Sequence, residues 1–212
     1  MKILGINGSH RKGKNTAALL KLVLEETERL GCSTELLELA DLDIKLCIAC
    51  NVCLKQSRCS VAGDDMAMVE HKLLEADGIL LGSPVYWSNV TALMKNFMDR
   101  SRYLHITRNL LAGKAGAAVT NAGLLHGGQE ATLKIMEGFL QAHGLHIVDA
   151  RNPNTGIFTI GVVGAMMSGF KEDKAVWRRS GADDELVQAT SRQLGRNMVA
   201  LIQQLSGASK MT

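Results

Sequence analysis

Apolar residues recur along the chain in two alternating patterns. Short, nearly continuous apolar runs predict five strands, at Lys2–Ile6, Ser33–Leu39, Gly78–Leu81, Ala115–Thr120 and Leu145–Val148. Longer segments with apolar residues three and four positions apart predict amphipathic helices at Thr16–Leu30, Asp64–Leu74, Thr91–Tyr103, Glu130–His143 and Asp183–Leu205. Apolar strands that alternate with helices are typical of a parallel sheet covered on both faces.

We therefore expect an α/β protein with a flavodoxin-like, doubly wound, five-stranded parallel sheet in the order 2-1-3-4-5. In such sheets, ligands bind at the carboxyl ends of the strands. The loops after the first, third and fourth strands are rich in small and polar residues; they are Asn7–Thr16, Ser83–Asn89 and Thr120–Gln129. We expect these three loops to meet at one edge of the sheet.

The length of 212 residues, 46% of them hydrophobic, predicts a single domain over residues 1–212. Two segments depart from the alternating pattern: a cysteine-rich loop at 40–63 and a variable segment at 149–182. Within the variable segment, Ile157–Met167 is apolar and glycine-rich, which is compatible with a hairpin, a lid or an oligomer contact. Lys171–Arg179 is charged, and we expect it to be a solvated surface segment.

The overall charge is close to neutral. A formal net charge of +3 favours neither a nucleic-acid partner nor a membrane surface. No apolar stretch approaches the roughly 18 residues of a membrane span. The first predicted strand begins at once and leaves no room for a signal peptide, so we expect a cytoplasmic protein.

The loop between the first strand and the first helix is a candidate phosphate site. Backbone N–H groups of such a loop and of the helix N-terminus point toward negative charge. Gly8 and Gly13 allow a tight turn and close approach to a ligand. Ser9, Asn15 and Thr16 add neutral donors, and positive charge surrounds the loop at His10, Arg11, Lys12 and Lys14.

Two other phosphate loops are less consistent with these residues. A nucleotide-hydrolase P-loop needs Ser or Thr after Gly13-Lys14 to hold magnesium, and Asn15 stands there instead. The dinucleotide fingerprint G-x-G-x-x-G is absent as well. A monophosphate such as that of FMN fits a loop of hydroxyls and amides, and the simpler alternative is a plain strand-to-helix turn.

The other two loops are candidates for binding a flat ring. Tyr86 and Trp87 are notable in a chain with only 4% aromatic residues, although Trp87 could instead pack in the core or against another subunit. Three glycines in the later loop permit close approach to a ring. We expect His126 to be solvated, and no residue stands out as catalytic. The candidate ligand-contacting residues are Pro84, Val85, Tyr86, Trp87, Ser88, Asn89, Thr120, Asn121, Gly123, Gly127, Gly128 and Gln129.

Four of the five cysteines lie within thirteen positions, in the spacing C-x2-C-x2-C-x5-C; they are Cys47, Cys50, Cys53 and Cys59. Such crowding suits a [4Fe–4S] cluster, because each of its irons needs one thiolate. Structural zinc sites usually carry two C-x2-C pairs farther apart, but zinc stays an alternative. A redox disulfide is another alternative, as is a protein that folds with the cluster empty or lost. We expect Cys32 to be a small buried apolar residue.

The phosphate loop, the cysteine spacing and Ser83-Pro84-Val85-Tyr86 together resemble the iron–sulfur flavoproteins. These belong to the flavodoxin-like NAD(P)H-dependent FMN reductase family, and the resemblance covers roughly residues 1–148. It implies FMN on the three loops, a [4Fe–4S] cluster on the four cysteines, and a homodimer or homotetramer. The helix Thr91–Tyr103 and the pair Tyr86–Trp87 are then candidates for a subunit interface.

Three functions from different classes follow. The first is an oxidoreductase that relays electrons between the cluster and FMN, with a ferredoxin-like redox partner protein or with NAD(P)H and a small acceptor. The second is a NAD(P)H-dependent FMN or quinone reductase with an idle or zinc-binding cysteine loop. The third is a non-enzymatic flavin-binding sensor whose cysteines cycle between thiol and disulfide.

Overall fold

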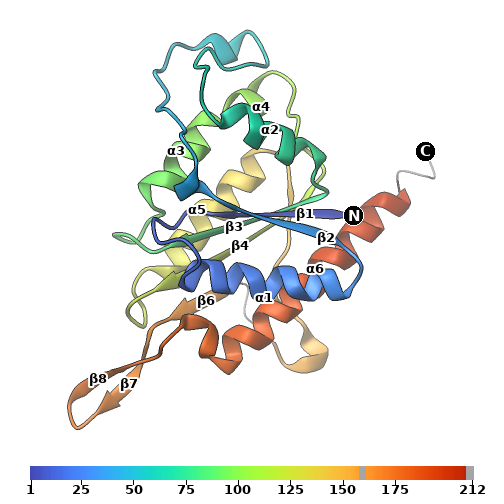
Figure 1. The fold of residues 1–212 in the computed structure, drawn as a ribbon. Coiled ribbons are helices and arrows are strands. Elements are labelled where there is room, and N and C mark those ends of the chain that lie inside the picture. The colour runs from blue at the N-terminus through green and yellow to red at the C-terminus, as the bar shows by residue number, and fades with distance from the viewer. Residues whose placement is uncertain (158–160, 209–212) are drawn as a thin grey trace.

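A parallel sheet in the order β2-β1-β3-β4-β5 forms the centre of the protein (Figure 1). The structure, a computed structural model, describes residues 1–157 and 161–208. The five strands are β1 (Lys2–Asn7), β2 (Ser33–Glu38), β3 (Gly78–Pro84), β4 (Ala115–Ala122) and β5 (His146–Ile147). All their pairings are parallel, so the doubly wound, flavodoxin-like fold expected from the sequence is confirmed.

Helices cover both faces of this sheet. Two of them, α1 (Asn15–Arg29) and α6 (Glu185–Ala208), pack together on one face (Figure 1). The opposite face is covered by α2 (Met66–Glu75), α3 (Ala92–Arg100) and α5 (Gln129–Ala142). Short 3₁₀ turns at Leu39–Asp41, Val52–Leu54, Pro153–Thr155 and Gly181–Asp183 lie in the connections.

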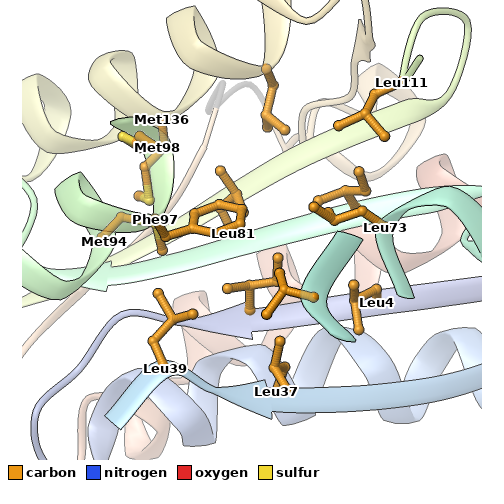
Figure 2. Packing of buried hydrophobic residues seen from close by; sticks show 14 of the residues in the cluster. Leu4, Leu37, Leu39, Leu73, Leu81, Met94, Phe97, Met98, Leu111 and Met136 are labelled. Carbon is orange, nitrogen blue, oxygen red and sulfur yellow. The ribbon is translucent and has the colours of Figure 1, made fainter. Parts of the chain in front are cut away.

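The alternation of side chains along each strand explains this two-faced arrangement. On β1, Ile3 packs in the cluster under α1 and α6, whereas Leu4 and Ile6 pack on the other side. Figure 2 shows the second cluster, in which Met94 and Phe97 of α3 lie over Leu81 of β3. The apolar face of α3 is therefore part of the core of this chain.

The fifth strand position is divided between two segments. Residues Ala115 and Gly116 of β4 pair with β5, but Val119–Ala122 pair with β6 (Val162–Ala165), which runs parallel to them. The sequence left a hairpin, a lid and an oligomer contact open for Ile157–Met167; in the structure Val162–Ala165 of this segment is a strand of the central sheet, while residues 158–160 lie outside the described residues. The carboxyl half of β4 would otherwise be a buried edge with unpaired backbone groups.

The remaining charged segment forms an antiparallel hairpin of β7 (Met167–Lys171) and β8 (Lys174–Trp177). Figure 1 shows it projecting from the body of the protein. Most of its residues are exposed, including Phe170 and Trp177. The expectation of a solvated surface segment is confirmed for the described residues of Lys171–Arg179.

The single helix expected over Thr91–Tyr103 is divided. It ends as α3 at Arg100, and a short helix, α4 (Tyr103–Ile106), follows. At the break, the Ser101 hydroxyl donates to the carbonyl of Met98 at 2.9 Å, and this bond competes with continuation of the helix. No helix among the described residues is long and apolar enough to span a membrane.

Candidate cofactor-binding site

The loop between β1 and α1 is held in a defined shape by its own polar side chains. Asn7 accepts the N–H of Ser9 at 3.0 Å, and the Ser9 hydroxyl accepts the N–H of Arg11 at 3.1 Å. Ser9 is buried, whereas Arg11 is exposed. Ser9 therefore shapes the loop, and the Arg11 side chain is free to reach an anion.

Glu38, at the end of β2, holds the other side of this loop. Its carboxylate accepts from the Asn7 amide at 2.6 Å and from the N–H of Gly13 at 3.1 Å. Lys12 turns outward to form an ion pair with Asp41. Arg11 and Lys14 have no ion-pair partner in the described part of the chain, so they are the cations available to a ligand.

The N-terminus of α1 opens directly onto the loop. Asn15 and Thr16 are in its first turn, where backbone N–H groups have no acceptor within the helix. The first backbone hydrogen bond of the helix runs from the Ala18 N–H to the Lys14 carbonyl, at 2.9 Å. These donors and the helix dipole together make an anion-binding position that fits a phosphate monoester.

Thr91 connects the phosphate loop to the start of α3. Its hydroxyl donates to the carbonyl of Gly8 at 2.5 Å and accepts the N–H of Met94 at 3.1 Å, which caps the helix. A Cβ on Gly8 would lie 2.7 Å from the Cβ of Met94, so only glycine fits there. The sequence analysis missed Thr91, although a threonine directly before an amphipathic helix is a typical N-cap.

The loop after β3 ends in a tight turn. Tyr86 and Asn89 exchange backbone hydrogen bonds of 2.9 and 3.1 Å, with Trp87 and Ser88 between them at positive φ. The Trp87 side chain is 100% exposed, so the alternative that it packs in the core of this chain is wrong. The Tyr86 ring lies parallel to that of His10, with centroids 6.0 Å apart, which joins this turn to the phosphate loop.

The loops after β3 and β4 touch each other. The N–H of Val85 donates to the Asn121 carbonyl at 2.9 Å, and Gly128, at φ +100°, lies so close to Ser88 that a Cβ would be 2.7 Å from the Ser88 Cα. Between the loops is a surface hollow of about 300 Å³, lined by Val85, Trp87, Ser88, Ala122, Gly123, Leu124 and Gly127. The three loops expected to meet at one edge therefore do so.

Three of the candidate residues have buried side chains that do not line this hollow, and two of these side chains bind protein groups. Thr120 donates to the Ser83 carbonyl at 2.7 Å, and Gln129 donates to the Leu124 carbonyl at 2.8 Å. The Asn121 side chain packs against Gly164 and Gly181, which have no room for a Cβ. The structure thus gives these side chains a role in joining the strands and closing the later loop. Pro84 and Asn89 lie at the two ends of the Val85–Ser88 segment.

All four cysteines of the loop between β2 and α2 line one hollow, together with Arg100, Arg102 and Tyr103. Cys47 and Cys50 are exposed, while Cys53 and Cys59 are half-buried against the core. Ala49 and Asn51, at positive φ, turn the chain between successive cysteines. Figure 1 shows this loop lying over α3 and α4, away from the sheet. Cys32, outside the loop, is buried as expected.

Four thiols line this hollow, and thiolates are the donors that iron–sulfur clusters take. A [4Fe–4S] cluster takes one thiolate at each iron, so its four thiols must surround a space and need not converge on a point. Among the described residues, no group of three or more Cys, His, Asp or Glu side chains is placed to hold a metal ion, so the chemistry of the four thiols is what this hollow offers a cluster. The Ser60 hydroxyl, 2.8 Å from the Cys50 sulfur, together with the Val52 N–H and Arg102, lowers the pKa of the Cys50 thiol.

The two ends of the cysteine loop are fixed to the body of the protein. Arg100 of α3 forms a buried ion pair with Asp64 and donates to the Lys45 carbonyl at 2.6 Å. Burial by itself would lower the pKa of the Arg100 guanidinium. The hydrogen bond and charge of Asp64, with a smaller contribution from Cys59, outweigh burial and raise that pKa. The sequence analysis missed this pair, because no local pattern marks partners that are 36 positions apart.

The sheet is doubly wound, and its carboxyl edge carries the candidate phosphate loop beside the loops after β3 and β4. This arrangement is that of the flavodoxin-like class of proteins. Within that class, the chain belongs to the NADPH-dependent FMN reductase family, whose model matches residues 1–156. It is a flavin-dependent oxidoreductase, and FMN is the flavin that the family description names.

Its relatives include proteins named for a second cofactor. An iron–sulfur flavoprotein of Archaeoglobus fulgidus is 37% identical over 201 residues, which cover 94% of each chain. One from Methanocaldococcus jannaschii is 40% identical over 153 residues, covering 72% of this chain and 78% of that protein. The resemblance to the iron–sulfur flavoproteins is thereby confirmed.

Among solved structures, RosB with a bound 8-demethyl-8-formylriboflavin 5'-phosphate intermediate matches 98% of this chain and 81% of its own. The TM-score is 0.76 and the sequence identity is 14%, so this likeness concerns the fold.

Proposed function

We propose that this oxidoreductase relays electrons between a [4Fe–4S] cluster on Cys47, Cys50, Cys53 and Cys59 and an FMN at the three loops. The observation that carries the proposal is that all four cysteines line one hollow. The names of the relatives in Archaeoglobus and Methanocaldococcus support it.

The residues at the sheet edge divide the binding of FMN between them. Arg11, Lys14 and the free N–H groups of Asn15 and Thr16 hold the phosphate, on a loop whose shape Ser9 and Glu38 maintain. Val85–Ser88 and Gly123–Gly127 line the flavin ring. FMN exchanges one or two electrons and a cluster exchanges one at a time, so the pair can join one-electron and two-electron partners.

Helix α3 connects the two proposed sites within one chain. The residue before it, Thr91, is bonded to the phosphate loop, and its last residue, Arg100, is bonded to the base of the cysteine loop. A helix of nine residues is about 14 Å long. The chain's contribution to electron transfer is thus to hold the two sites at a fixed separation on a rigid element.

The partners follow from this chemistry. We propose that the electron donor or acceptor is a ferredoxin-like redox protein, or NAD(P)H with a small acceptor, and that the cytoplasmic protein is a homodimer or homotetramer. The exposed Cys47 and Cys50 leave one side of the cysteine hollow accessible to such a protein. Light scattering of the purified protein measures the oligomeric state directly.

Replacing one cluster cysteine tests the proposal. In Cys50→Ser, produced and purified without oxygen, we expect iron and sulfide to be lost while FMN content stays at the wild-type level, because the two sites use different loops. Chemical assays of iron, sulfide and flavin on the same sample measure all three. Cys32→Ala is the matched control: it removes a buried thiol outside the loop and is expected to leave the iron content unchanged.

Two results would contradict the proposal. If Cys50→Ser lost FMN and iron together, the cysteine loop would be a structural support of the whole edge. If both variants kept the metal content of the wild type, the four-cysteine hollow would not be its site.

A second candidate function is a NAD(P)H-dependent FMN or quinone reductase whose cysteine loop carries zinc or nothing. The family description, NADPH-dependent FMN reductase, favours it. Rapid NADPH oxidation by the iron-free Cys50→Ser protein, with free flavin or quinone as acceptor, would favour this second function over the relay.

A further inference from the structure

Arg100 is the largest fully buried side chain in the described part of the protein, at 1% exposure. It is the last residue of α3 and lines the cysteine hollow. An arginine is rarely buried completely unless its donors are paired, because the guanidinium carries five N–H groups and a permanent charge.

Most of these donors hold the two ends of the cysteine loop. Besides Asp64, the terminal nitrogens bind the carbonyl of Lys45 at 2.6 Å and that of Val61 at 3.3 Å. Lys45 stands two residues before the first cysteine of the loop, and Val61 two residues after the last. Asp64 in turn accepts the N–H of Lys45 at 3.1 Å. The ion pair therefore closes the loop at its base.

One donor is left over. The Nε–H of Arg100 has no acceptor among the described residues, and leaving a buried donor unpaired is destabilising. The Cys59 thiol lies beside the guanidinium on the wall of the same hollow. A negatively charged sulfur at that position would supply the missing acceptor.

We propose that Arg100 donates its Nε–H to the Cys59 sulfur, or to a sulfide of a cluster bound in the hollow, and thereby raises the reduction potential of that cluster. The inference rests on the proposed function, because it needs a cluster at the four cysteines. A reduced cluster carries one more negative charge than the oxidised form, so a buried cation and a hydrogen bond to sulfur stabilise the reduced form more. Arg100 is a positioning and tuning residue.

The test compares Arg100→Lys with the wild type. Lysine keeps a positive charge for Asp64 but lacks the fork and the Nε–H. We expect iron and flavin contents at the wild-type level and a lower cluster potential in an anaerobic titration followed by electron paramagnetic resonance. At a fixed solution potential, the ratio of reduced to oxidised cluster should fall about tenfold, the effect of losing one charged hydrogen bond, which corresponds to about 59 mV.

Arg58→Gln is the matched control, because it removes a charge from the same loop at an exposed position. Water screens that charge, and we expect the cluster potential to be unchanged. An Arg100→Lys protein that folds and binds FMN but cannot retain the cluster would overturn the inference in favour of a purely structural role, in which Arg100 holds the base of the loop. A wild-type potential in Arg100→Lys would overturn the inference.

The same experiment distinguishes a failure of the proposed function from a failure of the role of Arg100. If the wild-type protein itself, isolated without oxygen, carries no cluster, the proposed function fails and the inference with it. If the wild type carries the cluster and only the potential of Arg100→Lys fails to move, the proposed function stands and the role of Arg100 is overturned.

Discussion

Gly128 shows how a single residue sets the distance between two ligand-facing loops. It combines a φ of +100° with a position where a Cβ would lie 2.7 Å from the Cα of Ser88. An alanine there must adopt a strained backbone and push the Val85–Ser88 segment away. For Gly128→Ala we expect FMN affinity to fall roughly tenfold or more, since about 1–3 kcal/mol of strain falls on the bound geometry. Fluorescence titration of the flavin-free protein measures the affinity.

Gly113→Ala is the control for this prediction. Gly113 also has a positive φ, of +81°, but nothing lies within 4 Å of its Cβ position, and it precedes β4 at the opposite end of the strand. The backbone strain should lower the free energy of unfolding by about 1 kcal/mol and leave FMN affinity unchanged. Equal losses of affinity in both variants would show that the contact with Ser88 is irrelevant.

His143 makes the stability of the fold depend on pH. Burial, with a smaller contribution from His105, lowers its pKa to about 4 from an ordinary value of 6.5. The unfolded state therefore binds the proton more tightly, and stability that is present at pH 7 is lost as the pH falls from 6.5 toward 4. Between pH 7 and 5 the loss from this group is about 2 kcal/mol. Urea unfolding at the two pH values should show a smaller decrease for His143→Gln, and an equal decrease would contradict the assignment.

At the scale of elements, α3 joins the phosphate loop to the cysteine loop. In Thr91→Ala, the helix loses its cap and Gly8 loses a hydrogen bond, so we expect the free energy of unfolding to fall by about 2 kcal/mol. FMN affinity should fall as well, because the loop that carries the phosphate donors is released. Thr91→Ser keeps the hydroxyl and should remain close to the wild type in both measurements. If Thr91→Ala matched the wild type in FMN affinity, the hydrogen bond between Thr91 and Gly8 would not contribute to FMN binding.

The sequence predicted elements well where the signal was local. The spacing of Leu19, Leu20 and Val23 identified α1 to within one residue at each end. The sequence pattern could not reveal that β4 pairs with β5 over its first residues and with β6 over its last ones. That pairing depends on the path by which the later segment comes back to the sheet, which no local pattern shows. The end of α3 at Arg100 was missed as well, because the sequence pattern does not show that the Ser101 hydroxyl binds the Met98 carbonyl in place of a continuing helix.

At the scale of the whole molecule, the parallel sheet explains which predictions about the site could succeed. Loops after β1, β3 and β4 share an edge in any sheet of this order, so the position of the site followed from the topology. The direction of individual side chains did not: Trp87 points fully into solvent, whereas Asn121 is buried against Gly181. Spacing alone marked the four cysteines, but only the fold adds Arg100 to their hollow.

The proposed relay requires both cofactors in one chain. The most direct measurement is the absorption spectrum of wild-type protein purified without oxygen, with iron, sulfide and FMN assayed on the same sample. We expect flavin bands above a broad iron–sulfur absorbance, with about one FMN, four irons and four sulfides per chain. Stoichiometric flavin without iron, in a sample never exposed to air, would contradict the relay and favour a simple FMN reductase.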